Sequence, residues 1–223
     1  MRYVSVALIA LALCSRAEAQ IIRPAPRVPQ PIGWASFSLG IWRPQAVNDG
    51  TTKSAWNFSD AVQYRVSLEK PLQSQATIGI TATLARASLS YETGAGSVAG
   101  AACPSTCDAD ANVSQLLASF HAGGGGFGIG LHQVIELGLG ATMYSNFRSR
   151  SGGERLPPTS PDIDLALAIG YGLGYSLSPT MQLNLVQDLA LVLHQRTGLA
   201  GGTSATSQQY TTRIGLRVGM GSK

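Results

Sequence analysis

Histidines, cysteines and a few charged residues are the side chains of this chain that could do the chemistry of an active site. A hydrolase triad needs a nucleophile, a base and an orienting acid that converge in space. Ser119 and His121 are two residues apart, so they share one face of a strand. Glu136 opposes them if residues 113–123 and 133–147 pair as a hairpin. These three are the candidate catalytic residues, but we prefer the alternative that they are polar packing inside the fold.

Cys103 and Cys107 stand close together in the segment CPSTC. In an exported chain the two thiols meet an oxidising compartment, which favours a local disulfide. A zinc site is the alternative, but it needs four ligands, and Asp108 and Asp110 are poor partners for two thiolates. The glycine-rich segments GGGGFGIG and GYGLG lack the strand-to-helix junction and the following lysine of a phosphate loop. We therefore expect a disulfide, no metal and no cofactor.

The first residues have the pattern of an export signal. Arg2 is followed by an apolar run over 4–13 and by a small-x-small site that ends at Ala19. This predicts a cleavable signal peptide over 1–19. The alternative of a lipoprotein, with Cys14 as the lipidated residue, is disfavoured because Leu13 stands where a lipobox has Gly or Ala. Residues 20–33 contain four prolines, which predict an extended periplasmic lead-in without ladder hydrogen bonds.

The remaining segment, 34–223, has a composition unlike that of an ordinary soluble domain. Only 13% of the chain is charged, against roughly 25% in soluble domains. Mean hydropathy is only +0.11, and no segment after the signal has the roughly 18 unbroken apolar residues of a membrane helix. Such a composition favours strands that alternate apolar and small polar residues across a membrane. The net charge of +4 is scattered along the chain, so we expect no nucleic-acid partner.

Alternation with a period of two dominates the chain from Trp34 onward. In residues 163–177 the odd positions are all Ile, Leu or Tyr, and the even positions are Gly, Ala, Ser or Asp. This sorting predicts a strand with two different faces. Similar patterns predict about eight strands, at 34–42, 62–69, 76–91, 113–123, 133–147, 163–177, 181–195 and 209–220. Within 76–91 the phase slips between Leu84 and Leu89, which we interpret as a bulge.

The segments between these strands alternate in length. Polar segments at 43–59, 92–112, 148–161 and 196–207 are long, and those at 70–75, 124–132 and 177–181 are mostly shorter. Long outer loops and short periplasmic turns are typical of outer-membrane barrels. The fold class predicted is therefore all-β: an up-and-down antiparallel transmembrane barrel of about eight strands, in one domain.

The small polar face of the predicted strands carries few charges, and they are of both signs. Such a face would carry unusually few charges for a surface in contact with water, whereas inside a narrow barrel its opposite charges can pair. We therefore expect the apolar face outside and a filled lumen. The interior charge cluster that we predict contains Arg65, Glu136, Asp188, Arg213 and Arg217. Aromatic residues near strand ends predict membrane girdles: Trp34, Trp42, Trp56, Tyr64, Tyr91, Phe120, Tyr144, Phe147, Tyr171, Tyr175 and Tyr210.

With this pattern, and with the closing strand YTTRIGLRVGM, residues 34–223 resemble the OmpA-like and OmpX-like outer-membrane barrels. That family usually ends in an aromatic residue, whereas here Met220 is the last outward residue. The resemblance implies a monomeric protein of the bacterial outer membrane. It implies contact with membrane lipid and a structural role or a surface role through loops that meet extracellular ligands. The first alternative is a lipid-modifying hydrolase that uses Ser119, His121 and Glu136, since some lipid deacylases of this architecture have such residues. The second is a soluble periplasmic barrel that binds an apolar ligand.

Overall fold

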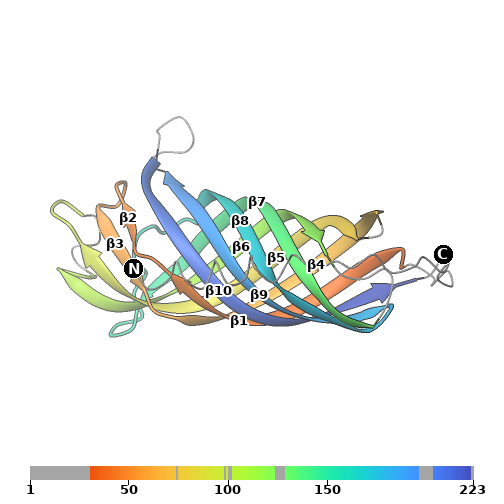
Figure 1. The fold of residues 1–223 in the computed structure, drawn as a ribbon. Helices are drawn as coiled ribbons and strands as arrows, with labels where there is room; N and C mark the ends of the chain where they lie inside the picture. The colour runs from red at the N-terminus through yellow and green to blue at the C-terminus, as the bar shows by residue number, and fades with distance from the viewer. Residues whose placement is uncertain are drawn as a thin grey trace, which may run out of the picture.

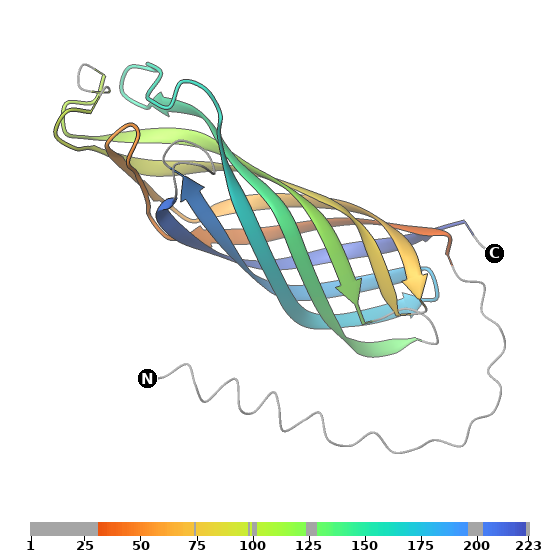
Figure 2. The same ribbon diagram turned by 90° about the horizontal axis from the view of Figure 1, so that it is seen from above.

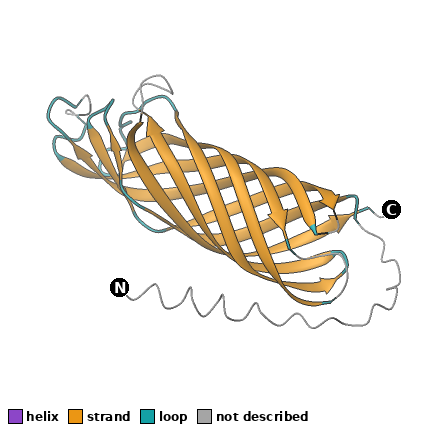
Figure 3. Ribbon diagram, turned by 45° about the horizontal axis from the view of Figure 1, so that its top comes forward, coloured by secondary structure: helices purple, strands orange, loops and turns teal. Residues whose placement is uncertain are grey.

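The computed structural model describes residues 31–73, 75–97, 99, 102–123, 129–195 and 203–221. The predicted signal peptide over 1–19 and most of the lead-in over 20–33 lie outside these residues. All regular structure in the described part is strand, as Figure 3 shows. No described helix is long and apolar enough to cross a membrane.

Eight long strands form the wall of a closed antiparallel barrel (Figure 1). They are β1 (Gly33–Pro44), β4 (Ala61–Gln73), β5 (Ala76–Thr93), β6 (Thr106–Ala122), β7 (Gly130–Ser149), β8 (Asp162–Ser178), β9 (Met181–Gln195) and β10 (Thr203–Met220). Each pairs with its neighbours in chain order, and β1 closes the sheet by pairing with both β4 and β10. The predicted all-β up-and-down barrel of eight strands is confirmed.

The two ends of the barrel differ. One end, which we call the loop end, carries the connections from β1 to β4, from β5 to β6 and from β7 to β8 (Figure 2). The opposite end, called the turn end, is where β1 begins and β10 ends. It includes the two-residue turn between β8 and β9. The predicted alternation of connection lengths therefore separates the two ends of the molecule.

Residues 43–59, expected to be a loop, contain a hairpin of β2 (Val47–Asp49) and β3 (Ser54–Phe58). Strand β3 pairs with the last residues of β5, beyond the point where β4 stops pairing with it at Gln63↔Ala85. The hairpin forms because Val47 and Trp56 are fully buried against the loop end of the barrel. The loop predicted over 92–112 is shorter in the structure than expected, because the ladder between β5 and β6 continues to the pair Glu92↔Thr106.

A belt of large apolar side chains covers the outside of the barrel. Its members have exposed fractions between 41% and 65% and include the following residues: Phe37, Leu39, Val66, Leu68, Ile78, Ile80, Leu84, Leu116, Leu137, Leu139, Ile163, Leu167, Ile169, Leu185 and Ile214. A soluble monomer does not expose an apolar surface of this extent. The apolar face thus points outward, as predicted, and the alternative of a soluble barrel with an apolar interior is wrong.

The bulge expected within 76–91 is absent, because the ladder between β5 and β6 runs without a register shift. Ile80 and Leu84 point outward in the belt, whereas Leu89 and Tyr91 point inward and are at most 2% exposed. The apparent phase slip has a different cause. Strand β5 extends past the apolar belt, so its outer face becomes polar and its inner face becomes apolar at the loop end.

Several aromatic residues expected in membrane girdles instead form a core inside the loop end. Trp42, Trp56, Tyr91, Tyr144 and Phe147 are at most 1% exposed, and the rings of Trp56 and Phe147 lie 4.7 Å apart. The girdle prediction is wrong for these residues, because sequence position near a strand end does not reveal which face a ring occupies. Tyr64, Tyr171, Tyr175 and Tyr210 do point outward.

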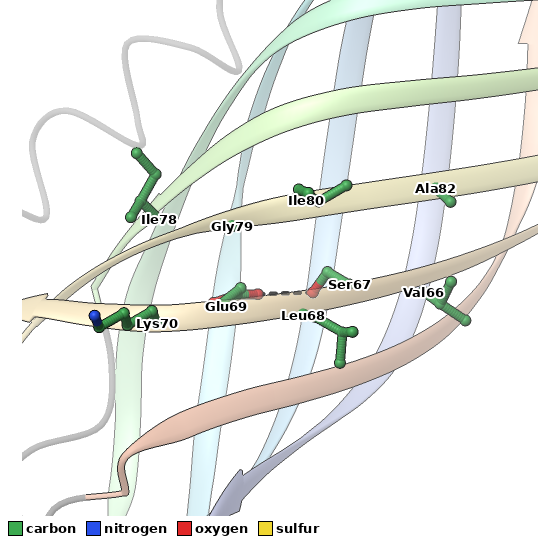
Figure 4. Close-up of a pocket in the computed structure, with 9 residues that line it drawn as sticks. All are labelled: Val66, Ser67, Leu68, Glu69, Lys70, Ile78, Gly79, Ile80 and Ala82. Atoms are coloured by element: carbon green, nitrogen blue, oxygen red, sulfur yellow. Dashed lines mark hydrogen bonds between the residues drawn. The ribbon is translucent and has the colours of Figure 1, made fainter.

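The outer surface also carries a groove of roughly 500 Å³ between β4 and β5. Figure 4 shows its walls, with Leu68 on one side and Ile80 on the other. It lies within the apolar belt, and its lining contains neither a histidine nor a cysteine. The groove belongs to the lipid-facing surface and offers no set of catalytic groups.

Candidate functional site

Two arginines and two carboxylates form an ion cluster in the middle of the lumen. Arg213 donates to Asp188 through Nε and to Glu136 through Nη2, both at 2.6 Å. Arg65 donates to Glu136 as well, and its Nη1 lies 3.5 Å from Asp188. The four groups come from β4, β7, β9 and β10, so only closure of the barrel brings them together. Their formal charges cancel, which is the condition for burying charge at a tolerable cost.

Glycine makes room for this cluster. In the ladder across β7, β8 and β9, Gly170 stands between Glu136 and Asp188. A Cβ at position 170 would lie 2.3 Å from Asp188 Oδ1, and one at Gly40 would lie 2.8 Å from the Cβ of Arg213. The missing side chains let the two carboxylates converge on one guanidinium.

Arg217, expected in the same cluster, lies apart from it near the turn end. Its Nη2 donates to Glu69 at 2.6 Å and to Thr77 at 3.0 Å, and its guanidinium lies 4.2 Å from the centre of the Trp34 ring. Arg213 and Arg217 are four residues apart on one strand face. The rise of a strand therefore separates their Cα atoms by about 13 Å, and Arg217 contacts Glu69 rather than Glu136.

The predicted triad residues lie in the lumen but do not form the chain of hydrogen bonds, from acid to base to nucleophile, that a catalytic triad requires. His121 Nδ1 lies 3.3 Å from Glu136 Oε1, and His121 Nε2 lies 3.0 Å from the carbonyl oxygen of Gly123. The Ser119 hydroxyl accepts a hydrogen bond from Thr81 at 3.0 Å instead of contacting His121. All three residues are at most 8% exposed and face away from the lipid. Glu136 is at the same time bound by two arginines, which compete with His121 for its oxygens.

A layer of amides and rings lies in the lumen beyond the ion cluster, toward the loop end. Gln209 accepts hydrogen bonds from Trp42 at 3.1 Å and from Gln115 at 2.9 Å, and it donates to the Tyr144 hydroxyl at 2.9 Å. All four side chains are at most 8% exposed. This amide layer, the ion cluster and the Arg217 group place bonded side chains at three levels of the lumen.

A fourth polar group at the loop end was not singled out in the sequence. His194 lies 2.7 Å from Asp164 and 3.4 Å from Asp162 through Nδ1, and 3.5 Å from Asp49 through Nε2. Its ring also packs on Trp56, with centroids 5.2 Å apart. The alternation placed Asp164 and His194 on inner faces, but the contribution of Asp49 depends on the unforeseen β2–β3 hairpin.

Asp49 is the member of this loop-end group that lies in the hairpin, outside the barrel wall. Burial opposes its ionisation, but hydrogen bonds from His194, from the Thr52 hydroxyl and from the backbone N–H groups of Thr51 and Thr52 outweigh that effect. Together they lower the pKa of Asp49 from 3.8 to about 2. The carboxylate is therefore ionised at neutral pH and holds the hairpin turn against the barrel wall.

The connection between β5 and β6 carries the predicted disulfide. Cys103 and Cys107 are joined, with their Cα atoms 5.8 Å apart. Cys103 is fully buried, and its sulfur lies 3.5 Å from the carbonyl oxygen of Tyr91. The bridge therefore fastens this connection to the aromatic core of the loop end.

No protein-family model matches the sequence, and no curated protein matches it. Among solved structures, neisserial surface protein A is similar with a TM-score of 0.50 at 10% identity, over 84% of this chain and 97% of that one. The fold is that of a small outer-membrane β-barrel. OprG of Pseudomonas aeruginosa has a TM-score of 0.44 at 10% identity, over 85% and 97%. The outer-membrane protease OmpT of Escherichia coli has a TM-score of 0.43 at 8% identity, over 84% and 96%. At 10% identity, the likeness to neisserial surface protein A shows the fold and not an activity.

Proposed function

We propose that this chain is an integral, monomeric outer-membrane protein with a closed lumen that acts through its extracellular surface. The observation that carries the proposal is the filling of the lumen by three levels of mutually bonded side chains, with Arg213, Gln209 and Arg217 at their centres. An eight-stranded barrel has an interior just wide enough for side chains. Transport through such a lumen would require the ion cluster to open.

The loop end supports a surface role. Its strands continue past the apolar belt and enclose a core of aromatic rings, to which the β2–β3 hairpin and the bridged β5–β6 connection are attached. A flexible loop loses conformational entropy when it binds a partner, whereas a preformed surface loses little. We therefore expect the loop end to be a rigid platform for contacts outside the cell.

Three measurements test this proposal. The membrane fraction should contain a protein whose gel mobility changes on boiling, and the refolded protein in planar bilayers should give no sustained conductance. A mutant lacking the gene should show an altered surface property, such as adhesion or detergent sensitivity. The wild-type gene should restore that property, and a gene in which a short turn replaces 46–59 should not. Sustained channels in the bilayer, or full restoration by the shortened gene, would contradict the proposal.

We propose further that the role is not enzymatic. Ser119 is bonded to Thr81 and lies inside the barrel, where an acyl chain in the membrane does not reach it. Purified protein should therefore leave the acyl chains of labelled lipopolysaccharide intact. Deacylation that is lost in His121→Ala would establish the hydrolase alternative in its place.

A further inference from the structure

The loop-end group brings together side chains that commonly bind metal ions. One atom each from Asp162, Asp164 and His194 can be chosen so that all lie within 4.8 Å of one another. The carboxylates come from the beginning of β8 and the imidazole comes from the end of β9. Asp164 and His194 have fully buried side chains, and that of Asp162 is 27% exposed. The set is therefore enclosed by protein and open to solvent through one carboxylate.

The distances between these atoms are close to those of a metal centre. Two donors on one tetrahedral Zn²⁺ lie about 3.4 Å apart, because each bond is about 2.0–2.2 Å long. His194 Nδ1 and Asp162 Oδ2 already lie 3.4 Å apart. The 2.7 Å between His194 Nδ1 and Asp164 Oδ2 is a hydrogen-bond length, so Asp164 would move outward by roughly 0.7 Å.

Asp49 supplies a second, independent observation. It lies 3.5 Å from His194 Nε2, the ring nitrogen that faces away from Asp162 and Asp164. Histidines that bind a metal through one nitrogen usually donate their other N–H to a carboxylate, which fixes the ring and its tautomer. Asp49 stands where such a carboxylate is required, although it comes from a different element, β2.

The charge of the group also favours a cation. Among the residues that the structure describes, the ion pairs of Asp49 and of Asp162 are both with His194. One imidazolium carries a single positive charge, which cannot balance two carboxylates. A divalent cation placed between His194 and Asp162 would supply the balance.

We propose that Asp162, Asp164 and His194 bind a first-row divalent metal ion, with Zn²⁺ as the best-fitting probe, and that Asp49 positions the imidazole. One nitrogen and two carboxylate ligands suit such ions, whereas Ca²⁺ and Mg²⁺ are held by oxygen ligands. Three protein ligands leave coordination positions for water or for a group supplied from outside the cell. The ion would also join β8, β9 and the hairpin, because all of these contribute to the group.

The test is a calorimetric titration of Zn²⁺ into the untagged, refolded full chain in detergent micelles, with Co²⁺ absorption as a second readout. Asp162→Asn removes one ligand at a partly exposed position and leaves the contact between His194 and Asp164 in place. Asp110→Asn is the matched control, since Asp110 is a loop-end carboxylate that pairs with Arg150 instead. Heat-dependent gel mobility shows that each variant is folded.

We expect wild type and Asp110→Asn to bind one Zn²⁺ with equal affinity and to be stabilised against heat by the ion. Asp162→Asn should bind at least about ten-fold more weakly and should lose the visible absorption bands of bound Co²⁺. Absence of saturable binding to wild type, or equal binding by a folded Asp162→Asn variant, would overturn the proposal.

Discussion

Single residues decide whether charge can be buried in this lumen. Each carboxylate of the central cluster lies near both arginines, and Arg213 contacts Glu136 and Asp188 at 2.6 Å each. Removing one member would leave its partners buried without compensation, which costs far more than the net gain from forming the pair. The stability of the barrel should therefore depend on the balance of positive and negative charge in the cluster rather than on the number of its contacts.

Glu136→Gln tests this balance. The amide can still accept one hydrogen bond but leaves two arginines opposite a single carboxylate, so we expect a loss of about 3 kcal/mol in the free energy of unfolding. Urea unfolding in lipid vesicles measures it. Glu154→Gln, at an exposed loop position, is the control and should unfold like wild type. Unchanged urea resistance of Glu136→Gln would show that the cluster does not stabilise the barrel.

Asp49 predicts a dependence of the loop end on pH. Its pKa is lowered from 3.8 to about 2, so its contribution to stability is complete above pH 3.8 and is lost as the pH falls through about 2. Asp49→Asn should therefore weaken amide protection in β2 and β3 near neutral pH, as measured by hydrogen exchange. Near pH 2 the difference from wild type should shrink, and a difference that stays constant would exclude this carboxylate as its cause.

At the scale of elements, the β2–β3 hairpin and the loop-end halves of β5, β6 and β7 form a second layer of structure above the belt. Trp56 connects the hairpin to β7 and to β9, because its ring contacts those of Tyr144, Phe147 and His194. The membrane-spanning halves of the same strands are held by other contacts, namely the ladders and the ion cluster. A substitution that destabilises one layer should therefore leave the other layer folded.

Trp56→Ala should detach the hairpin without unfolding the barrel. Truncating a fully buried aromatic side chain costs about 3–5 kcal/mol, and here that loss falls on the loop-end core. Trypsin should then cleave after Lys53, in the hairpin turn, faster than in wild type, while gel mobility stays heat-dependent. Trp34→Ala, at the turn end, is the control for loss of a buried indole and should not change cleavage at Lys53.

At the scale of the whole molecule, the outward belt makes the bilayer a part of the folding environment. Large aliphatic side chains on every wall strand face outward, where water would have to solvate them. On β5 the belt ends near Leu84, and the outward residues that follow are Arg86, Ser88 and Ser90. The same strand thus crosses from lipid into water.

Ile80→Arg and Ser90→Arg place the same charge on the same face of β5, inside and beyond the belt. The first should lower the free energy of unfolding in vesicles by about 2–4 kcal/mol, because a charge then faces hydrocarbon. The second should have little effect, because position 90 faces water. Equal effects of the two substitutions would contradict the position of the belt.

The sequence alone determined the eight wall strands and the face of each that meets lipid, because the alternation of side chains along a strand and the scarcity of charge can both be read within one segment. Residues 163–177 illustrate this, since every outward Ile, Leu and Tyr in them could be assigned before the fold was known. For Glu136, the sequence predicted the group of arginines from which its partners come but not which of them it contacts. Charges of both signs on the inner faces have to pair, but the alternation does not show which charges lie at the same height in the lumen.

The tertiary structure decided which charges meet and where the membrane ends. Arg217 pairs with Glu69 rather than Glu136, because strand tilt and register fix the height of each residue along the axis. The aromatic core and the loop-end group of His194 depend on a hairpin with only three residues in its first strand, which is too short to show a period. Local patterns specify faces, and only barrel closure specifies the neighbours across the lumen.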